Sequence, residues 1–172
     1  MKIVPLSSVP VPDVEALLDR AFGLDRHGKT AYRVRAGLAP IAELSVALVD
    51  ASGRLVGSIQ CWPVTLACDD GGHVPMVMLG PIAIAPAIQG SGLGQLLTRH
   101  ALAAADSSAV PGHDIVMLVG DPEYYARFFG FSDEHTGRWR LPGPWEPRRL
   151  LARGAAVPDR PGVIEGRVTA AA

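Results

Sequence analysis

Residues 89–94 form the run Gln-Gly-Ser-Gly-Leu-Gly, whose types and spacing suit the binding of a phosphate group. The run follows an apolar, strand-like segment, Met76–Ile84, and opens a segment with helical periodicity from Leu93 to about Ala105. Its three glycines leave backbone N–H groups unobstructed at the positive end of a helix. Such a turn binds phosphate or pyrophosphate, although the same glycines also occur in plain strand–helix turns.

Two familiar phosphate loops do not fit this run. A nucleoside-triphosphatase loop ends in Gly-Lys-Ser/Thr, whereas Gly92-Leu93-Gly94 contains no lysine. A dinucleotide fingerprint needs an acidic residue that closes the following strand, but that strand ends at Gly120 and Asp121 lies beyond it. The run therefore indicates a phosphate-bearing ligand of another kind.

A second group of residues with chemical potential occupies 120–131, Gly-Asp-Pro-Glu-Tyr-Tyr-Ala-Arg-Phe-Phe-Gly-Phe. Asp121 can cap a short helix with Pro122 at its first position, and Gly130 ends that helix. Aromatic residues on such a helix usually belong to the core, but a tyrosine can also turn its hydroxyl into a cleft. Tyr124 and Tyr125 point about 100° apart, so at most one of them occupies a given site.

The elements that position these residues follow from hydrophobic periodicity and turn residues. Helices are expected at 11–22, 31–36, 93–105 and 122–129, and strands at 2–6, 44–49, 55–62, 76–84, 115–119, 149–157 and 163–168. Residues 50–53, Asp-Ala-Ser-Gly, are typical of a β-hairpin turn, and Pro63 is expected to bend or end the strand that follows this turn. The strand–helix–strand unit from 76 to 119 implies a right-handed crossover with parallel pairing of its two strands.

Composition bounds the class of protein. The 172 residues are 48% hydrophobic and 19% charged, which is typical of one globular domain with a substantial core. A net charge of −1 gives no sign of nucleic-acid binding. The chain has no run long enough for a membrane span and no signal-peptide pattern at its start, so we expect a cytoplasmic protein. Cys61 and Cys68 lack the partners of a zinc site; we expect reduced thiols and no metal, with a disulfide between them conceivable.

The glycine run and the tyrosine segment, in this order and about one strand–helix–strand unit apart, resemble the GNAT acyltransferase superfamily. Three successive sequence motifs are similar to those of its YhbS-like branch: Leu-Gly-Pro-Ile-Ala-Ile, then Gln-Gly-Ser-Gly-Leu-Gly, then Gly-Asp-Pro-x-x-Tyr. The resemblance covers roughly residues 1–137 and is strongest from 79 to 131. It implies an α/β (α+β) fold with a mixed, mostly antiparallel central sheet, a splayed parallel strand pair and flanking helices. We expect one domain over 1–172, in which 138–172 extend the sheet.

On this resemblance the glycine run binds the pyrophosphate of coenzyme A, and the break at Gly80-Pro81 lets strand backbone bind the pantetheine arm. The implied coenzyme A contacts are Ile82, Ala83, Ile84, Gln89, Gly90, Ser91, Gly92, Leu93, Gly94, Asp121, Tyr125 and Phe128. The implied catalytic residue is Tyr125, whose hydroxyl protonates the departing thiolate. The chain has one residue more between arginine and glycine than the family pattern; a helical bulge can absorb it, and Tyr124 is the second choice.

The implied reaction is transfer of an acetyl group from acetyl-CoA to an amine of a small molecule or a protein, by direct attack in a ternary complex. No nucleic acid, membrane or metal is implied, and a homodimer is left open. Residues 76–84 contain no acidic residue that could act as a general base, and His73 at their start is more typical of an exposed turn. Two alternatives stay open: a non-catalytic coenzyme A-binding or protein-interaction module, and an acyl donor larger than acetyl.

Overall fold

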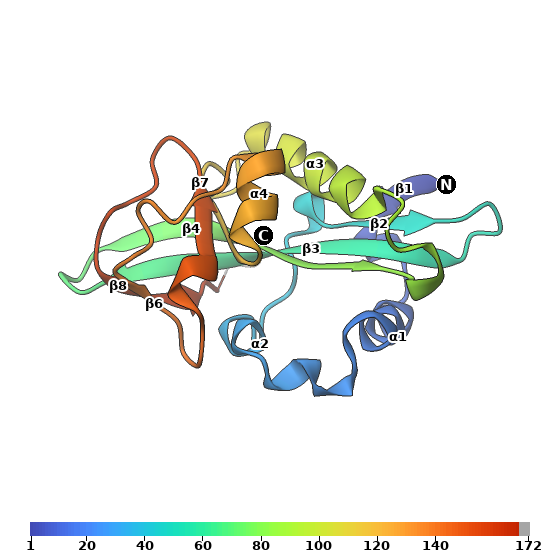
Figure 1. Cartoon of the computed structure of the whole chain (residues 1–172), viewed down its shortest axis with the longest axis horizontal. Coiled ribbons are helices and arrows are strands. Elements are labelled where there is room, and N and C mark those ends of the chain that lie inside the picture. Colours follow the sequence, from blue (N-terminus) through green and yellow to red (C-terminus); the bar gives the residue numbers. More distant parts are fainter. Residues whose placement is uncertain (169–172) are drawn as a thin grey trace. The chain divides into compact units, whose positions relative to one another are not determined.

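The computed structural model describes residues 1–168, which form a mixed sheet with helices on its faces (Figure 1). Within this part of the chain the sheet has eight strands, ordered β1-β2-β3-β4-β5-β7, with β8 paired to β3 and β6 paired to β8. Most pairings are antiparallel; β4 with β5 and β6 with β8 are parallel. The predicted fold class, a mostly antiparallel mixed sheet with a parallel pair and flanking helices, is confirmed.

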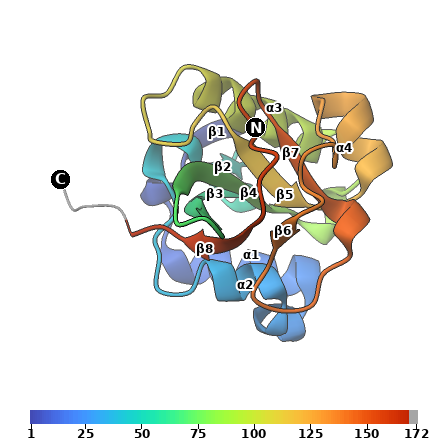
Figure 2. The ribbon, with the colours of Figure 1, turned by 90° about the vertical axis from the view of Figure 1, so that its left-hand side faces the viewer.

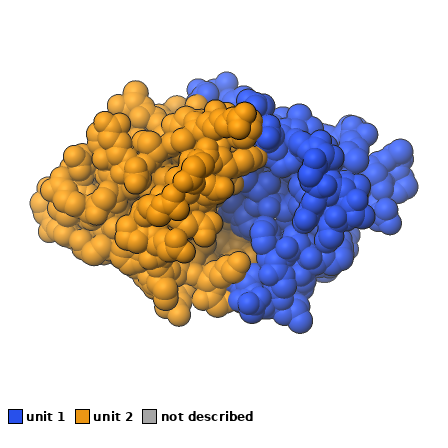
Figure 3. Space-filling model, in the orientation of Figure 1, with its two compact units in different colours: residues 1–27, 40–61, 80–108 blue, residues 28–39, 62–79, 109–172 orange. Residues whose placement is uncertain are grey.

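The chain divides into two compact units (Figure 3). Unit 1 comprises residues 1–27, 40–61 and 80–108, and unit 2 comprises residues 28–39, 62–79 and those from 109 on. Strands β3 (Leu55–Cys68) and β4 (His73–Ile84) contribute residues to both units. Each unit has its own core and is described by itself.

Unit 1 contains β1 (Lys2–Pro5), α1 (Val11–Phe22), β2 (Val46–Val49) and α3 (Leu93–Asp106), together with the first half of β3. Helices α1 and α3 lie on opposite faces of its strands (Figure 1). The β2–β3 hairpin turns at Asp50, whose Oδ1 accepts hydrogen bonds from the Ser52 and Arg54 N–H groups at 2.9 and 3.0 Å. The core of this unit packs one face of α1 against the sheet: Val14, Leu17, Leu18, Ala47, Leu55 and Ala83.

Unit 2 contains α2 (Thr30–Val34), β5 (Val116–Val119), α4 (Pro122–Phe129), β6 (Trp139–Arg140), β7 (Leu150–Arg153) and β8 (Gly162–Gly166). Helix α2 lies beside β8 (Figure 2). A Cβ atom added at Gly166 of β8 would lie 2.6 Å from the Val34 carbonyl oxygen of α2, so only a glycine allows this approach. The core of the unit includes Trp62, Val64, Leu66, Met76, Met117, Trp139 and Ile164.

Some predicted boundaries were wrong. β3 does not end at Pro63 but continues to Cys68, because the ladder with β8 begins only at Val64, so the missing proline N–H interrupts no bond of that ladder. The strand expected at 149–157 ends at Arg153, where Gly154 takes a φ of +137°. The strand expected at 163–168 spans Gly162–Gly166.

Candidate functional site

The glycine run lies in unit 1 and enters α3 through a left-handed residue. Gly90 has a φ of +81° and Gly92 a φ of +80°, the region in which a side chain is strained, and Gly92 is the residue that caps α3. The predicted turn between strand and helix is thus confirmed as a local structure. The N–H groups of the first helical turn have no partner within the helix and carry its positive partial charge.

Two polar side chains of the run bond back to the chain just before it. The amide of Gln89 donates to the Ile84 carbonyl at 3.2 Å, and the hydroxyl of Ser91 donates to the Ile88 carbonyl at 2.6 Å. These bonds tie the turn to the end of β4. Residues 89–92 are exposed, and neither of these two side-chain hydrogen bonds uses an N–H group of the turn.

Gly94 combines open space with an ordinary backbone conformation. Outside its chain neighbours and the backbone of its own helix, a Cβ atom built on it would meet no heavy atom within 4 Å, and its φ is not in the positive range. The local fold therefore does not demand a glycine at this position. The space beside it is open at the N-terminal turn of α3, where a phosphate oxygen would approach the backbone.

The β4 segment that leads into the run is shaped by Gly80, which has a φ of +112°. Beyond it, Ala83 is buried in the core of unit 1, whereas Ile82 and Ile84 are half-buried. The Ile84 side chain packs over Gly57, where a Cβ atom would lie 3.0 Å from Ile84 Cδ1 and 3.3 Å from Leu97 Cδ1 of α3. The three residues named for pantetheine contact thus run directly into the turn; their contact with the ligand stays a prediction.

In unit 2 the parallel ladder between β4 and β5 pairs Val77 with Val116 and Met78 with Met117. The chain then leaves β5 and enters α4 through Asp121. Asp121 Oδ1 accepts hydrogen bonds from the N–H groups of Glu123 at 3.0 Å and Tyr124 at 3.4 Å, as an N-cap does. A hydrogen bond with Glu123, above all, lowers the pKa of the Asp121 carboxyl.

The last turn of α4 is wider than an α-helical turn. The Gly130 N–H donates to the carbonyls of both Ala126 and Tyr125, and the Phe131 N–H donates to the Tyr125 carbonyl at 3.2 Å. A bond between residues five apart has the spacing of a π turn. From Asp121 to Tyr125 the helix is regular, with a Tyr125 N–H to Asp121 carbonyl bond of 3.0 Å. The widened turn lies after Tyr125, where a bulge that absorbs one extra residue would leave the count from Asp121 unchanged; the assignment of Tyr125 stays a prediction.

Tyr125 is held among aromatic rings. Its ring centroid lies 4.9 Å from that of Tyr124, 6.0 Å from that of Phe129 and 5.8 Å from that of Phe131. Burial, with a smaller contribution from Tyr124, raises the pKa of the Tyr125 hydroxyl to about 12. The hydroxyl therefore carries its proton at neutral pH and is a proton donor rather than a base.

Phe128, also named for cofactor contact, stacks within α4: its centroid lies 5.2 Å from that of Tyr124, and the Arg127 guanidinium lies 5.1 Å from it. Whether it contacts coenzyme A stays a prediction. Gly120, quoted in the motif without a role, proves to be the residue that makes room for the Tyr125 ring. A Cβ atom there would lie 2.5 Å from Tyr125 Cε2.

The remaining candidates of the sequence lie elsewhere. Cys61 and Cys68 are buried free thiols, and burial raises the pKa of the Cys61 thiol to about 12. His73 is exposed at the start of β4. Over residues 1–168, no three His, Cys, Asp or Glu side chains gather as a metal site would require. In the same part of the chain no helix is both long and apolar enough to cross a membrane.

Comparison with known proteins gives a family and a fold. A family model of the acetyltransferase (GNAT) domain matches residues 2–132. The structure of a GNAT family N-acetyltransferase, YhbS, from Escherichia coli in complex with CoA superposes with a TM-score of 0.72 at 23% identity, covering 96% of this chain and 89% of that chain. A GNAT family acetyltransferase from Brucella melitensis in complex with acetyl-CoA gives a TM-score of 0.57 at 26% identity, covering 90% of this chain and 96% of that chain. No curated protein matches this chain.

Proposed function

Because the chain belongs to the GNAT acetyltransferase family, we propose that it is an acetyl-CoA-dependent N-acetyltransferase that acts in the cytoplasm on an amine of a small molecule or a protein. The observation that carries the proposal is the turn at residues 89–94. It presents the N-terminal N–H groups of α3 behind two left-handed glycines, Gly90 and Gly92. A coenzyme A pyrophosphate is an anion that such a turn binds.

The donor half of the reaction follows from this turn and from the β4 residues that precede it. Residues 82–84 would bind the pantetheine arm through their backbone, and the turn would bind the pyrophosphate. Structures of the Escherichia coli and Brucella melitensis proteins contain CoA and acetyl-CoA. This supports coenzyme A as the ligand that the turn accepts.

The chemical step is an acyl transfer. The amine nitrogen attacks the thioester carbonyl carbon, a C–N bond forms, and the C–S bond breaks with its electron pair on sulfur. Backbone N–H groups near Ile82 would stabilise the negative charge that develops on the carbonyl oxygen. The thiolate takes the hydroxyl proton of Tyr125, which is protonated at neutral pH because burial raises its pKa to about 12. The amine loses a proton to water, and the tyrosinate takes a proton back from water, so Tyr125 is restored for the next turnover.

The proposal is tested by measuring thiol release from acetyl-CoA over a panel of amines, with coenzyme A affinity measured separately. Tyr125→Phe keeps the ring contacts and removes the proton donor, so turnover should fall roughly 100-fold, within the usual range for general acid catalysis, while coenzyme A affinity changes little. Tyr124→Phe is the matched control on the neighbouring position and should retain most of the turnover. Equal loss of turnover and affinity in Tyr125→Phe would reject the leaving-group role.

A non-catalytic coenzyme A-binding module is the second candidate. It is favoured by the strand β4, whose sequence His73–Ile84 contains no aspartate or glutamate to act as a base. Measurable binding of acetyl-CoA with no thiol release for any amine of the panel would favour this candidate. Competition between acetyl-CoA and longer acyl-CoA donors tests the length of the acyl group.

A further inference from the structure

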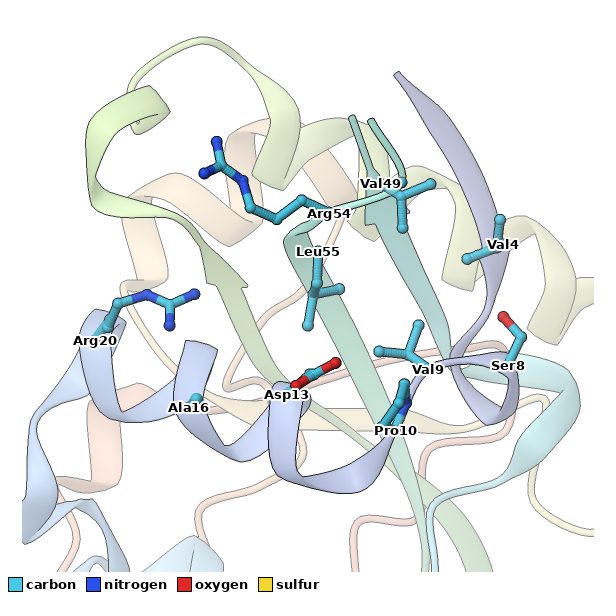
Figure 4. Close-up of a pocket in the computed structure, with 11 residues that line it drawn as sticks. Val4, Ser8, Val9, Pro10, Asp13, Ala16, Arg20, Val49, Arg54 and Leu55 are labelled. Atoms are coloured by element: carbon cyan, nitrogen blue, oxygen red, sulfur yellow. The ribbon is translucent and has the colours of Figure 1, made fainter. Parts of the chain in front are cut away.

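Unit 1 contains a cavity of about 460 Å³ that lies between α1, the start of the chain and the β2–β3 turn (Figure 4). Its size falls within the roughly 300–1,000 Å³ that is usual for small-molecule sites. None of the residues 82–94 line it. The lining combines an apolar surface with three charged side chains, Asp13, Arg20 and Arg54.

One face of α1 contributes an acidic and a basic side chain to the lining of this cavity. Asp13, Ala16 and Arg20 all line it, and their spacing of three and four residues places them on the same side of the helix. Asp13 and Arg20 are separated by about 10 Å along the helix axis, which is too far for a direct ion pair across the small Ala16. Because helical side chains lean toward the N-terminus, Arg20 leans over Ala16 toward Asp13. In Figure 4 its guanidinium points from α1 toward Leu55.

The Asp13 and Arg20 side chains do not take part in the polar interactions of the described fold. Within residues 1–168 neither Asp13 nor Arg20 has a side-chain hydrogen bond or an ion pair, whereas arginines elsewhere in the chain are engaged. Arg26, for example, bonds to Asp19 at 2.9 Å, and Arg140 bonds to Asp69 at 2.6 Å. Arg20 and Asp13 are therefore available to a ligand.

The third charge comes from the hairpin. Arg54 forms an ion pair through its Nε with Asp50 at 3.5 Å, and its side chain is 80% exposed. Figure 4 shows its side chain extending from the β2–β3 turn over the cavity. Two guanidinium groups at one cavity suit a carboxylate, which an arginine fork binds with two parallel hydrogen bonds.

The apolar part of the lining lies between these charges. It is formed by Val9 from the segment before α1, Val49 from β2 and Leu55 from β3. Leu55 is buried and Val9 and Val49 are half-buried, so their exposed surface forms a floor on which an aliphatic group would lose contact with water.

From these charges and this floor we infer that the cavity binds a small aliphatic amino acid as a zwitterion. Arg20 and Arg54 take the carboxylate, Asp13 takes the ammonium group, and the branched side chain lies on Val9, Val49 and Leu55. The site requires both ligand charges, because Asp13 repels a simple carboxylate and the two arginines repel a simple amine.

Calorimetric titration of the full chain with three probes that share an isobutyl group tests this assignment: L-leucine, isovalerate and isoamylamine. L-leucine should bind about tenfold more tightly than either singly charged probe, since each missing charge removes one charge-assisted interaction. Arg20→Gln should weaken leucine and isovalerate about tenfold, and it should strengthen isoamylamine because it removes a charge that repels the amine. Asp13→Asn should weaken leucine and isoamylamine by a similar factor, and it should strengthen isovalerate because it removes a charge that repels the carboxylate.

Arg138→Gln is the control, since that arginine forms an exposed ion pair with Asp159 in unit 2. It should change none of the three affinities. Absence of leucine binding, equal affinity for leucine and isovalerate, or the same loss in Arg20→Gln and Arg138→Gln would each overturn the inference. Asp13 and Arg20 are exposed, so both variants should fold, and circular dichroism of each variant verifies this.

Discussion

The ring of Tyr125 lies directly against Gly120: a Cβ atom on Gly120 would lie 2.5 Å from Tyr125 Cε2 and 3.0 Å from Cδ2. Gly120 directly follows β5 and Tyr125 is one turn into α4, so the two residues are brought together by the sharp entry into the helix at Asp121. The φ of Gly120 is not in the positive range, so its backbone does not demand glycine. The position demands glycine because of the tyrosine ring.

Gly120→Ala should therefore displace the Tyr125 ring and with it the hydroxyl. We expect turnover to fall at least tenfold, because a proton donor moved by about 1 Å loses much of its effect. Affinity for coenzyme A should change less than threefold. Steady-state kinetics with acetyl-CoA and direct titration with coenzyme A measure the two quantities. A variant with normal turnover would mean that the tyrosine ring can move aside without consequence.

The raised pKa of Tyr125 predicts a stability effect at high pH. Its value of about 12, caused mainly by burial, exceeds the ordinary tyrosine value near 10. The folded state holds the proton more tightly, so this contribution to stability is fully present below about pH 10 and is lost as the pH rises toward 12. Urea unfolding of the wild type should lose stability between pH 10 and 12 more steeply than that of Tyr125→Phe. Parallel curves for the two proteins would contradict the assignment of this pKa.

The helix α4 shows what local sequence signals suffice to predict. Asp121, Pro122 and Gly130 each act through their own backbone position, as cap, first residue and left-handed end, and all three were predicted in place. The widened last turn was not fixed by these signals. In that turn the N–H groups of Gly130 and Phe131 both donate to the Tyr125 carbonyl, and this backbone conformation forms where the neighbouring aromatic rings pack together.

The strand β3 shows what such signals do not predict. From the local sequence alone, a proline predicts the end of a strand. Pro63, however, lies just before the residues of β3 that pair with β8, which is about a hundred residues further along the chain. β6 is only Trp139–Arg140 and exists because it pairs with β8. Neither feature has a local periodicity, since both depend on partners that are distant in sequence. The charged cavity of unit 1 escaped prediction for the same reason, since its lining comes from three separate segments.

The pairing of Arg26 with α1 predicts a large stability effect within unit 1. Arg26 is buried, bonds to Asp19 at 2.9 Å and contacts Glu15, and so ties residues 24–28 to α1. Arg26→Met should lower the free energy of unfolding by about 2 kcal/mol, less than the loss of a fully buried pair because both carboxylates keep access to water. Arg138→Gln, which breaks an exposed pair, should cost under about 1 kcal/mol. Equal losses in urea unfolding would show that Arg26 contributes no more than a surface pair.

Gly94 allows binding and folding to be separated at the glycine turn. It lies in the first turn of α3, and outside its chain neighbours and the backbone of its own helix no heavy atom lies within 4 Å of a Cβ position. Gly94→Ala should therefore leave the fold intact and, because alanine favours a helix, raise the free energy of unfolding by up to about 1 kcal/mol. The same methyl group would occupy the space that a pyrophosphate oxygen needs, so affinity for coenzyme A should fall about tenfold or more.

Gly92→Ala is the contrasting variant, because its φ of +80° strains any side chain. We expect it to lose both stability and coenzyme A affinity, whereas Gly94→Ala loses affinity alone. Thermal unfolding without ligand and titration with coenzyme A distinguish the two patterns. If Gly94→Ala binds coenzyme A as the wild type does, the pyrophosphate does not approach this turn and the assignment of residues 89–94 as its binding site is wrong.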